Sequence, residues 1–105
     1  MAERLERMLA DGQDSPTLRF GLGNAWLADD PARAAVHLAA AVAQDAAYSA
    51  AWKLLGRART ALGDEAGAIA AYEQGIAAAE RRGDVQAAKE MRVFLKRLRK
   101  TGSDN

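Results

Sequence analysis

The sequence predicts an all-α protein of short antiparallel helices, and three observations support this fold class. Helix-capping residues and helix-ending glycines divide the chain at short intervals. Apolar residues recur at helical spacing, whereas no segment shows the strict alternation of a half-buried strand. The pattern in the middle of the chain also returns with a period of about 34 residues, so these helices belong to a repeat.

Capping side chains mark where the helices start. Ser15 and Asp30 each precede a proline, which suits the first helical position because its missing N–H would have no partner there. Other serine and aspartate side chains can cap later helices, and glycines can end helices in the left-handed conformation. These further residues are Ser49, Asp64, Asp84, Gly63 and Gly83. Together the signals predict six helices, near residues 2–11, 16–28, 31–44, 50–62, 65–81 and 84–99.

Both terminal helices have an apolar face to bury. Leu5, Met8 and Leu9 form a stripe on the first helix. Met91 and Leu98 belong to a similar stripe on the last helix. Since the connections between helices are only a few residues long, we expect neighbouring helices to run antiparallel.

The four middle helices form two copies of one unit. Positions one period apart hold related side chains, as in Ala34 with Ala68 and Leu38 with Tyr72. A Leu-Gly dipeptide also recurs, at Leu22-Gly23 and Leu55-Gly56, but its two copies are 33 residues apart, one fewer than the period of the repeat. This difference predicts a shorter turn in the first unit.

These residues give the chain a resemblance to the tetratricopeptide repeat family. The second unit resembles the family more closely, through Trp52, Leu55, Gly56, Ala68, Tyr72 and Gly75. The first unit shows the same pattern at Leu22, Gly23, Trp26, Ala34 and Leu38. Small residues stand where two helices would cross, and large residues would fill the space beside each crossing. The first unit departs from the second by placing Arg19 where the second has Trp52.

The resemblance implies one domain over residues 1–100, folded as a right-handed superhelical stack of helix-turn-helix repeats. Repeat 1 would cover about residues 15–48 and repeat 2 about residues 49–82, behind a leading N-terminal helix. A helix near residues 84–99 would cap the open end of the stack with a polar outer face. Residues 101–105 are expected to form a disordered tail. The chain also looks like small bacterial proteins of two such repeats, a group with no assigned activity.

Composition narrows the function classes. The chain has 105 residues, 50% hydrophobic but only 6% aromatic, which suits one core of small, closely packed side chains. The absence of cysteine excludes disulfides, cysteine-ligated zinc and thiol nucleophiles, and it fits a reducing cytoplasm. No apolar stretch approaches the roughly 20 residues needed to span a bilayer, so we expect no membrane segment. Net charge is +1, yet residues 81–100 hold eight basic and two acidic residues. Such a basic segment can indicate a surface for an acidic partner or a nucleic acid, and it is also typical of a solvated terminal helix.

We expect no catalytic site, no metal site and no cofactor. His37 is the only histidine and has alanines around it, which favours a surface or partly packed position over acid–base chemistry. A metal site is not expected, because the chain has no second histidine and no cysteine to serve as ligands. Gly21 and Gly23 lie inside a helix, so they suit packing rather than phosphate binding. Trp26 and Trp52 occupy inward-facing repeat positions, so we expect them in the core rather than in a ligand pocket.

In the tetratricopeptide repeat fold the first helix of each repeat lines a concave groove, so the resemblance implies a peptide site there. Its exposed residues are expected to include Phe20, Asn24, Lys53, Arg57 and Thr60. Lys53 and Arg57 are four residues apart and therefore share a helix face. A basic surface for an acidic segment could add three residues of the last helix, Lys89, Arg92 and Lys96.

The function predicted first is a non-catalytic adaptor that binds a peptide segment of a partner protein in this groove. Some family members clamp a C-terminal carboxylate, but Phe20 and Leu54 replace two of the clamp residues and only Asn24 matches. Chaperone C-terminal peptides are therefore not the expected ligands. One alternative is a structural protein that associates with itself and has no foreign ligand. Nucleic-acid binding through the basic C-terminal helix ranks last, because no aromatic residues interleave with its cations.

Overall fold

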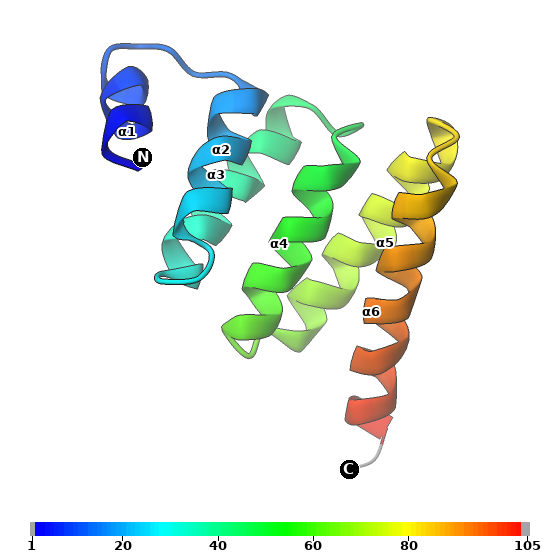
Figure 1. The fold of residues 1–105 in the computed structure, drawn as a ribbon. Coiled ribbons are helices and arrows are strands. Elements are labelled where there is room, and N and C mark those ends of the chain that lie inside the picture. The colour runs from blue at the N-terminus through cyan, green and yellow to red at the C-terminus, as the bar shows by residue number, and fades with distance from the viewer. Residues whose placement is uncertain (1, 104–105) are drawn as a thin grey trace.

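The computed structural model describes residues 2–103 and confirms an all-helical fold (Figure 1). Six helices form within this range, and no strand does: α1 (Ala2–Ala10), α2 (Pro16–Trp26), α3 (Pro31–Gln44), α4 (Ser49–Ala61), α5 (Glu65–Arg81) and α6 (Val85–Ser103). Their bounds lie within about two residues of the predicted ones, except that α6 continues further. Residues 101–103, predicted to belong to a disordered tail, extend α6, and residues 104 and 105 lie outside the described part.

Local side-chain caps explain where most helices begin. Ser15, Asp30 and Asp64 each accept a backbone N–H from the first turn of the following helix, at 3.1, 3.1 and 3.0 Å. The prediction that Ser49 caps α4 is wrong, because Ser49 is the first residue of that helix and is buried. Asp45 closes the preceding turn instead, its carboxylate accepting the N–H of Ala47 at 3.0 Å.

The helices form two rows. Helices α2, α4 and α6 lie side by side at the front of Figure 1, with α3 and α5 behind them. Successive front helices contact each other directly, whereas α3 and α5 contact only front helices. Because the front row is the more closely spaced, the stack curves toward it. The face of α2, α4 and α6 is therefore the concave face.

Close helix crossings depend on the small residues of the repeat. A Cβ atom placed on Gly56 would lie 2.6 Å from the ring of Tyr72, and one on Gly75 would lie 2.8 Å from Cβ of Trp52. In the first repeat, a Cβ on Gly23 would overlap the side chain of Leu38. Each glycine therefore allows the approach of the large residue expected beside it.

The core consists mainly of alanine and leucine. Ala34, Leu38, Leu55 and Ala68 are 1% exposed or less, and Tyr72 is 2% exposed. The buried residues form two clusters, one centred on α3 and α4 and the other on α5 and α6. Small side chains thus fill an interior that holds a single fully buried aromatic ring among the described residues.

The two tryptophans pack at the border of the first cluster and are only partly buried. Trp52 Nε1 donates to the carbonyl oxygen of Ala46 at 2.9 Å. Trp26 Nε1 donates to the Glu6 carboxylate of α1 at 3.2 Å, and the guanidinium of Arg33 lies 4.3 Å from its ring centroid. Both were expected in the core, but they lie at its border, where Trp52 also lines a cleft and each indole ties a neighbouring segment to the stack.

Candidate functional site

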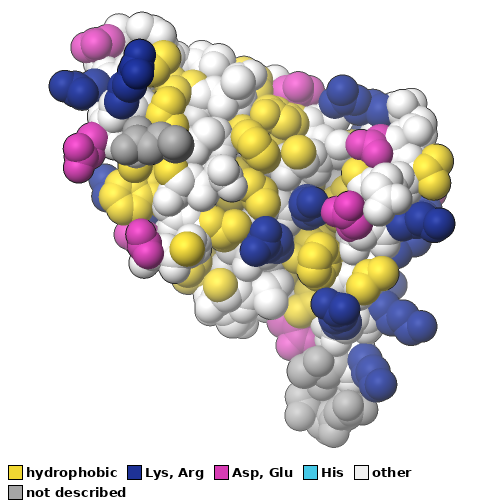
Figure 2. Space-filling view, viewed as in Figure 1, with side chains coloured by type: hydrophobic (Ala, Val, Ile, Leu, Met, Phe, Trp, Pro, Cys, Tyr) yellow, Lys and Arg dark blue, Asp and Glu magenta, His cyan; other side chains and the backbone are white. Residues whose placement is uncertain are grey.

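Among the hollows of the concave face, two flank the C-terminal half of α4, one on each side. The first, of about 370 Å³, is the α2–α4 hollow, lined by Asn24, Leu27, Ala28, Arg57 and Ala61. The second, of about 290 Å³, is the aromatic hollow, lined by Thr60, Glu65, Tyr72, Phe94, Arg97 and Leu98. Figure 2 shows hydrophobic side chains reaching the surface in patches across this face, with cations between them. The concave face is therefore uneven, with apolar depressions bordered by charge.

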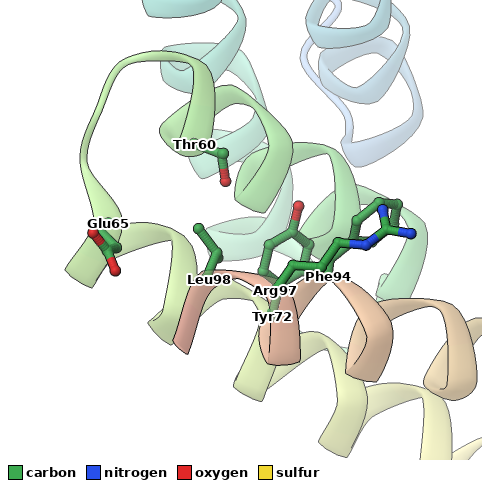
Figure 3. Close-up of a pocket in the computed structure, with 6 residues that line it drawn as sticks. All are labelled: Thr60, Glu65, Tyr72, Phe94, Arg97 and Leu98. Atoms are coloured by element: carbon green, nitrogen blue, oxygen red, sulfur yellow. The ribbon is translucent and has the colours of Figure 1, made fainter. Parts of the chain in front are cut away.

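Stacked rings form the floor of the aromatic hollow. The rings of Tyr72 and Phe94 lie 5.6 Å apart with an interplanar angle of 19°, and the guanidinium of Arg97 is 5.9 Å from the centroid of Phe94. Figure 3 shows the Tyr72 hydroxyl directed toward Thr60, with Glu65 and Arg97 on opposite sides of the hollow. Burial raises the pKa of the Tyr72 phenol, while the hydrogen bond with Thr60 and the charge of Arg57 oppose that rise.

Arg57 and Asn24 are brought together by the fold, although they come from different repeats. Both are exposed and line the α2–α4 hollow. Arg57 makes no ion pair with any residue of the described part of the chain. It is also close enough to the aromatic hollow for its charge to act on Tyr72. An exposed cation thus lies between two depressions.

Lys53 does not join Arg57 in one basic patch. Its ammonium donates to the Glu90 carboxylate of α6 at 2.9 Å, and the two side chains are 30% and 41% exposed. This hydrogen bond and the charge of Lys53 lower the pKa of Glu90. Lys53 therefore bridges α4 to α6, and its charge is largely met within the protein.

Phe20 lies apart from the two hollows. Its ring stacks on that of Tyr48, with centroids 5.1 Å apart at 27°, and it packs against the core. It is partly buried rather than exposed. Phe20 thus packs the middle of α2 against the turn before α4, which leaves less of its ring for a ligand than the sequence suggested.

Two of the α6 cations predicted to extend the basic surface, Arg92 and Lys96, lie in the seam between α5 and α6, away from Lys53 and Arg57, and the third, Lys89, is exposed. The α6 residue that faces Lys53 is Glu90. Arg92 pairs with Glu80 of α5, and Lys96 lines a groove between α5 and α6. The structure therefore separates Arg92 and Lys96 from Lys53 and Arg57, whereas Arg97 of the same helix lines the aromatic hollow.

Sequence reasoning missed a polar cluster at the N-terminal end of the stack. His37, expected at the surface or partly packed, is 6% exposed. Its Nδ1 is 3.1 Å from Arg19 Nη1, and its Nε2 is 3.2 Å from the Glu6 carboxylate. Because a guanidinium can only donate, His37 accepts at Nδ1 and donates from Nε2 to Glu6 in its neutral form.

The cluster explains why Arg19 replaces the tryptophan of the second repeat. Its guanidinium also donates twice to Asp14, at 2.9 and 3.0 Å. This interaction, with a hydrogen bond from Gln44, lowers the pKa of Asp14 to about 2. Apart from Arg19 and Asp14, the bonded residues are 18 or more positions apart, so no local spacing could have revealed them. They join α1 to α2 and α3, which gives the cluster a structural role.

Within residues 2–103, no three histidine, cysteine, aspartate or glutamate side chains are grouped to hold a metal ion. No helix in the same range is long and apolar enough to cross a membrane.

Comparisons with known proteins agree on the fold. No protein-family model matches the chain. The chain is 60% identical over 99 residues to TPR repeat-containing protein PA0015 of Pseudomonas aeruginosa, and the match covers 93% of this chain and 94% of the relative. The solution structure of protein BPP2914 from Bordetella parapertussis superposes with a TM-score of 0.82 at 48% identity, covering 96% of this chain and 89% of that one.

Proposed function

This chain belongs to the tetratricopeptide repeat family, and from that premise we propose that it is a non-catalytic adaptor that binds an acidic peptide segment of a partner protein across α4. Proteins of this family are in general protein-interaction modules. The proposed site is the concave face between the α2–α4 hollow and the aromatic hollow. A peptide lying there would cross the C-terminal half of α4.

The exposed position of Arg57 carries this proposal. Its guanidinium is unpaired within the described residues and borders one hollow directly. A carboxylate of the peptide could therefore pair with Arg57 while apolar neighbours enter the depressions on either side. Asn24 adds an amide that can donate to a peptide carbonyl or accept from a peptide N–H.

The same geometry changes the role proposed for Lys53. Because Lys53 already pairs with Glu90, its replacement would remove a bridge between α4 and α6 rather than a free cation. Arg57 should therefore contribute more to binding an acidic ligand than Lys53 does. Thr60 remains a candidate at the edge of the aromatic hollow, although its hydroxyl already donates to the Gly56 carbonyl oxygen at 2.7 Å.

Titration of the ¹⁵N-labelled protein with an acidic peptide tests the proposal. The probe contains leucine and glutamate, and its matched control carries glutamine in place of every glutamate. We expect the acidic peptide to move the amide resonances of Asn24, Arg57 and Thr60. Arg57→Ala should weaken binding about fivefold, the upper range for one exposed charge pair. Lys53→Ala should have a smaller effect on affinity.

Two results would contradict the proposal. The first is that neither peptide moves resonances of the concave face. The second is that the glutamine peptide binds as tightly as the acidic one and Arg57→Ala changes nothing. Light scattering over a range of protein concentrations addresses self-association, the alternative from the sequence. A mass that rises with concentration, together with no peptide binding, would favour that alternative.

A further inference from the structure

A second surface lies at the C-terminal end of the stack, in the seam between α5 and α6. It is a groove of about 480 Å³, lined by Glu73, Ile76, Arg92, Leu95, Lys96 and Arg99. Ile76 and Leu95 form its apolar floor. The α6 residues of this seam differ from those that line the aromatic hollow, so it is separate from the peptide site proposed above.

The repeat shows what such a groove looks like when it is complete. A shift by one period, the same shift that relates Ala34 to Ala68, places Glu73 at the position of Ala39 and Ile76 at the position of Val42. In the preceding repeat, Ala39 and Val42 line a cleft of about 390 Å³ between α3 and α5. Trp52, Leu55 and Arg59 of α4 line the middle of that cleft, and α5, the second helix after α3, supplies its far wall through Ala70, Ala71 and Gln74.

Along α5 the seam therefore corresponds to this cleft, but no helix takes the place of its far wall within the described residues. After α6, the described part of the chain contains no further helix that could supply this wall. The seam therefore has the shape in which this fold accepts a helix. One repeat earlier the chain fills the position itself, with α5.

The charge of the seam indicates what kind of helix would fit. Arg92 pairs with Glu80, and Arg99 donates to Glu73 at 2.6 Å. These four side chains are 50% to 57% exposed, so each pair is weak and can be exchanged for another carboxylate. Lys96 makes no ion pair within the described residues. In Figure 2, several Lys and Arg side chains are spread over the part of the molecule that α6 occupies.

We propose that this seam docks an acidic amphipathic helix of a partner protein, in the position that a next helix would take in a longer stack. Apolar side chains of the partner would cover Ile76 and Leu95, and carboxylates on its flanks would meet Lys96, Arg92 and Arg99. The net positive charge of residues 81–100 would also steer such a helix toward this end of the molecule. The proposal does not depend on peptide binding at the concave face.

A synthetic helix tests this proposal. The probe is a 17-residue peptide with leucine at three- and four-residue spacing and glutamate on both sides of the leucine stripe. A peptide of the same composition in scrambled order has the same charge but no apolar face. In an NMR titration, we expect only the ordered peptide to move the amide resonances of Ile76 and Leu95.

Charge reversal at one exposed position supplies the second readout. Lys96→Glu should weaken binding of the ordered peptide about tenfold, because an attraction is lost and a repulsion is added. Arg7→Glu on α1 makes the same change in net charge at the opposite end of the stack and should alter the affinity less than twofold. Circular dichroism of both variants establishes that the fold is intact.

Three outcomes would overturn the proposal. The scrambled peptide could bind as well as the ordered one, or the two charge reversals could weaken binding equally, and either result would mean non-specific attraction. The ordered peptide could instead move only Asn24 and Arg57, which would place it on the concave face. If a DNA duplex moves Ile76 and Leu95 and the ordered peptide does not, the seam is a nucleic-acid surface.

Discussion

Replacing Gly56 with alanine tests the helix crossing on which the second repeat is built. The added Cβ would lie 2.6 Å from two ring carbons of Tyr72 and 2.8 Å from a third. Carbon atoms in ordinary contact are about 3.5–4.0 Å apart, so the ring would have to move by about 1 Å. Tyr72 is 2% exposed and stacks on Phe94 of α6, so this movement would be transmitted to the last helix.

The magnitude follows from two opposing effects. Overpacking of a rigid core typically costs about 1–3 kcal/mol. Alanine is favoured over glycine inside a helix by about 1 kcal/mol, which offsets part of this loss. We therefore expect Gly56→Ala to lower the free energy of unfolding by about 1 kcal/mol. For a domain of this size the melting temperature should fall by about 4–8 °C.

Gly21→Ala is the matched control, because it makes the same chemical change in another helix. A Cβ on Gly21 would meet only Cδ1 of Leu5, at 3.4 Å, so helix propensity should dominate. This variant should be more stable than the wild type by about 0.5–1 kcal/mol. Thermal and urea unfolding followed by circular dichroism measure both variants. If Gly56→Ala is as stable as Gly21→Ala, Tyr72 does not pack against Gly56 and the crossing is described wrongly.

Three further predictions concern the core, the last helix and the polar cluster. Ala68→Leu should lower the free energy of unfolding by about 1–3 kcal/mol in urea unfolding, because Ala68 is fully buried; an unchanged midpoint would contradict this packing. Removing residues 84–105 should expose the α5 face that α6 covers and lower the melting temperature or cause association; an unchanged, monomeric protein would show that α6 is not a cap. Asp14 should stabilise the fold fully above its unfolded pKa of 3.8 and lose this effect as the pH falls through about 2, because its pKa is lowered mainly by Arg19. Urea unfolding of the wild type and Asp14→Asn at pH 5 and pH 2 should show a stability difference that shrinks at the lower pH, and a constant difference would exclude this linkage.

The polar cluster has a consequence for α1. None of the residues of this helix is buried, so apolar contact holds it only weakly. Glu6 accepts a hydrogen bond from Trp26 and lies 3.2 Å from Nε2 of His37, and these two contacts anchor α1 to α2 and α3. One carboxylate thus supplies these polar contacts of the leading helix, whose apolar residues Leu5, Met8 and Leu9 are only half-buried, whereas α6 is held by the buried residues Met91 and Leu95.

The helices and the repeat could be predicted from the sequence because their causes are local or periodic. A capping oxygen such as that of Ser15 or Asp64 bonds three residues ahead, so it can be recognised from adjacent residues. The crossing residues Gly56 and Gly75 could be recognised because the repeat brings a small residue to the same place in the first unit, Gly23 and Ala41 respectively. Local hydrogen bonding and periodic burial therefore determine the elements and their order.

The site was predicted less well, because the partner of a charged side chain depends on how distant helices cross. Lys53 and Arg57 share one helix face, yet one meets Glu90 of α6 and the other borders Asn24 of α2. The sequence showed that His37 lies in an alanine-rich segment, but not that Arg19 and a glutamate of α1 would enclose it. Periodicity identifies the face of a helix, whereas charge pairing is set by contacts a few ångströms long between segments that only the tertiary structure brings together.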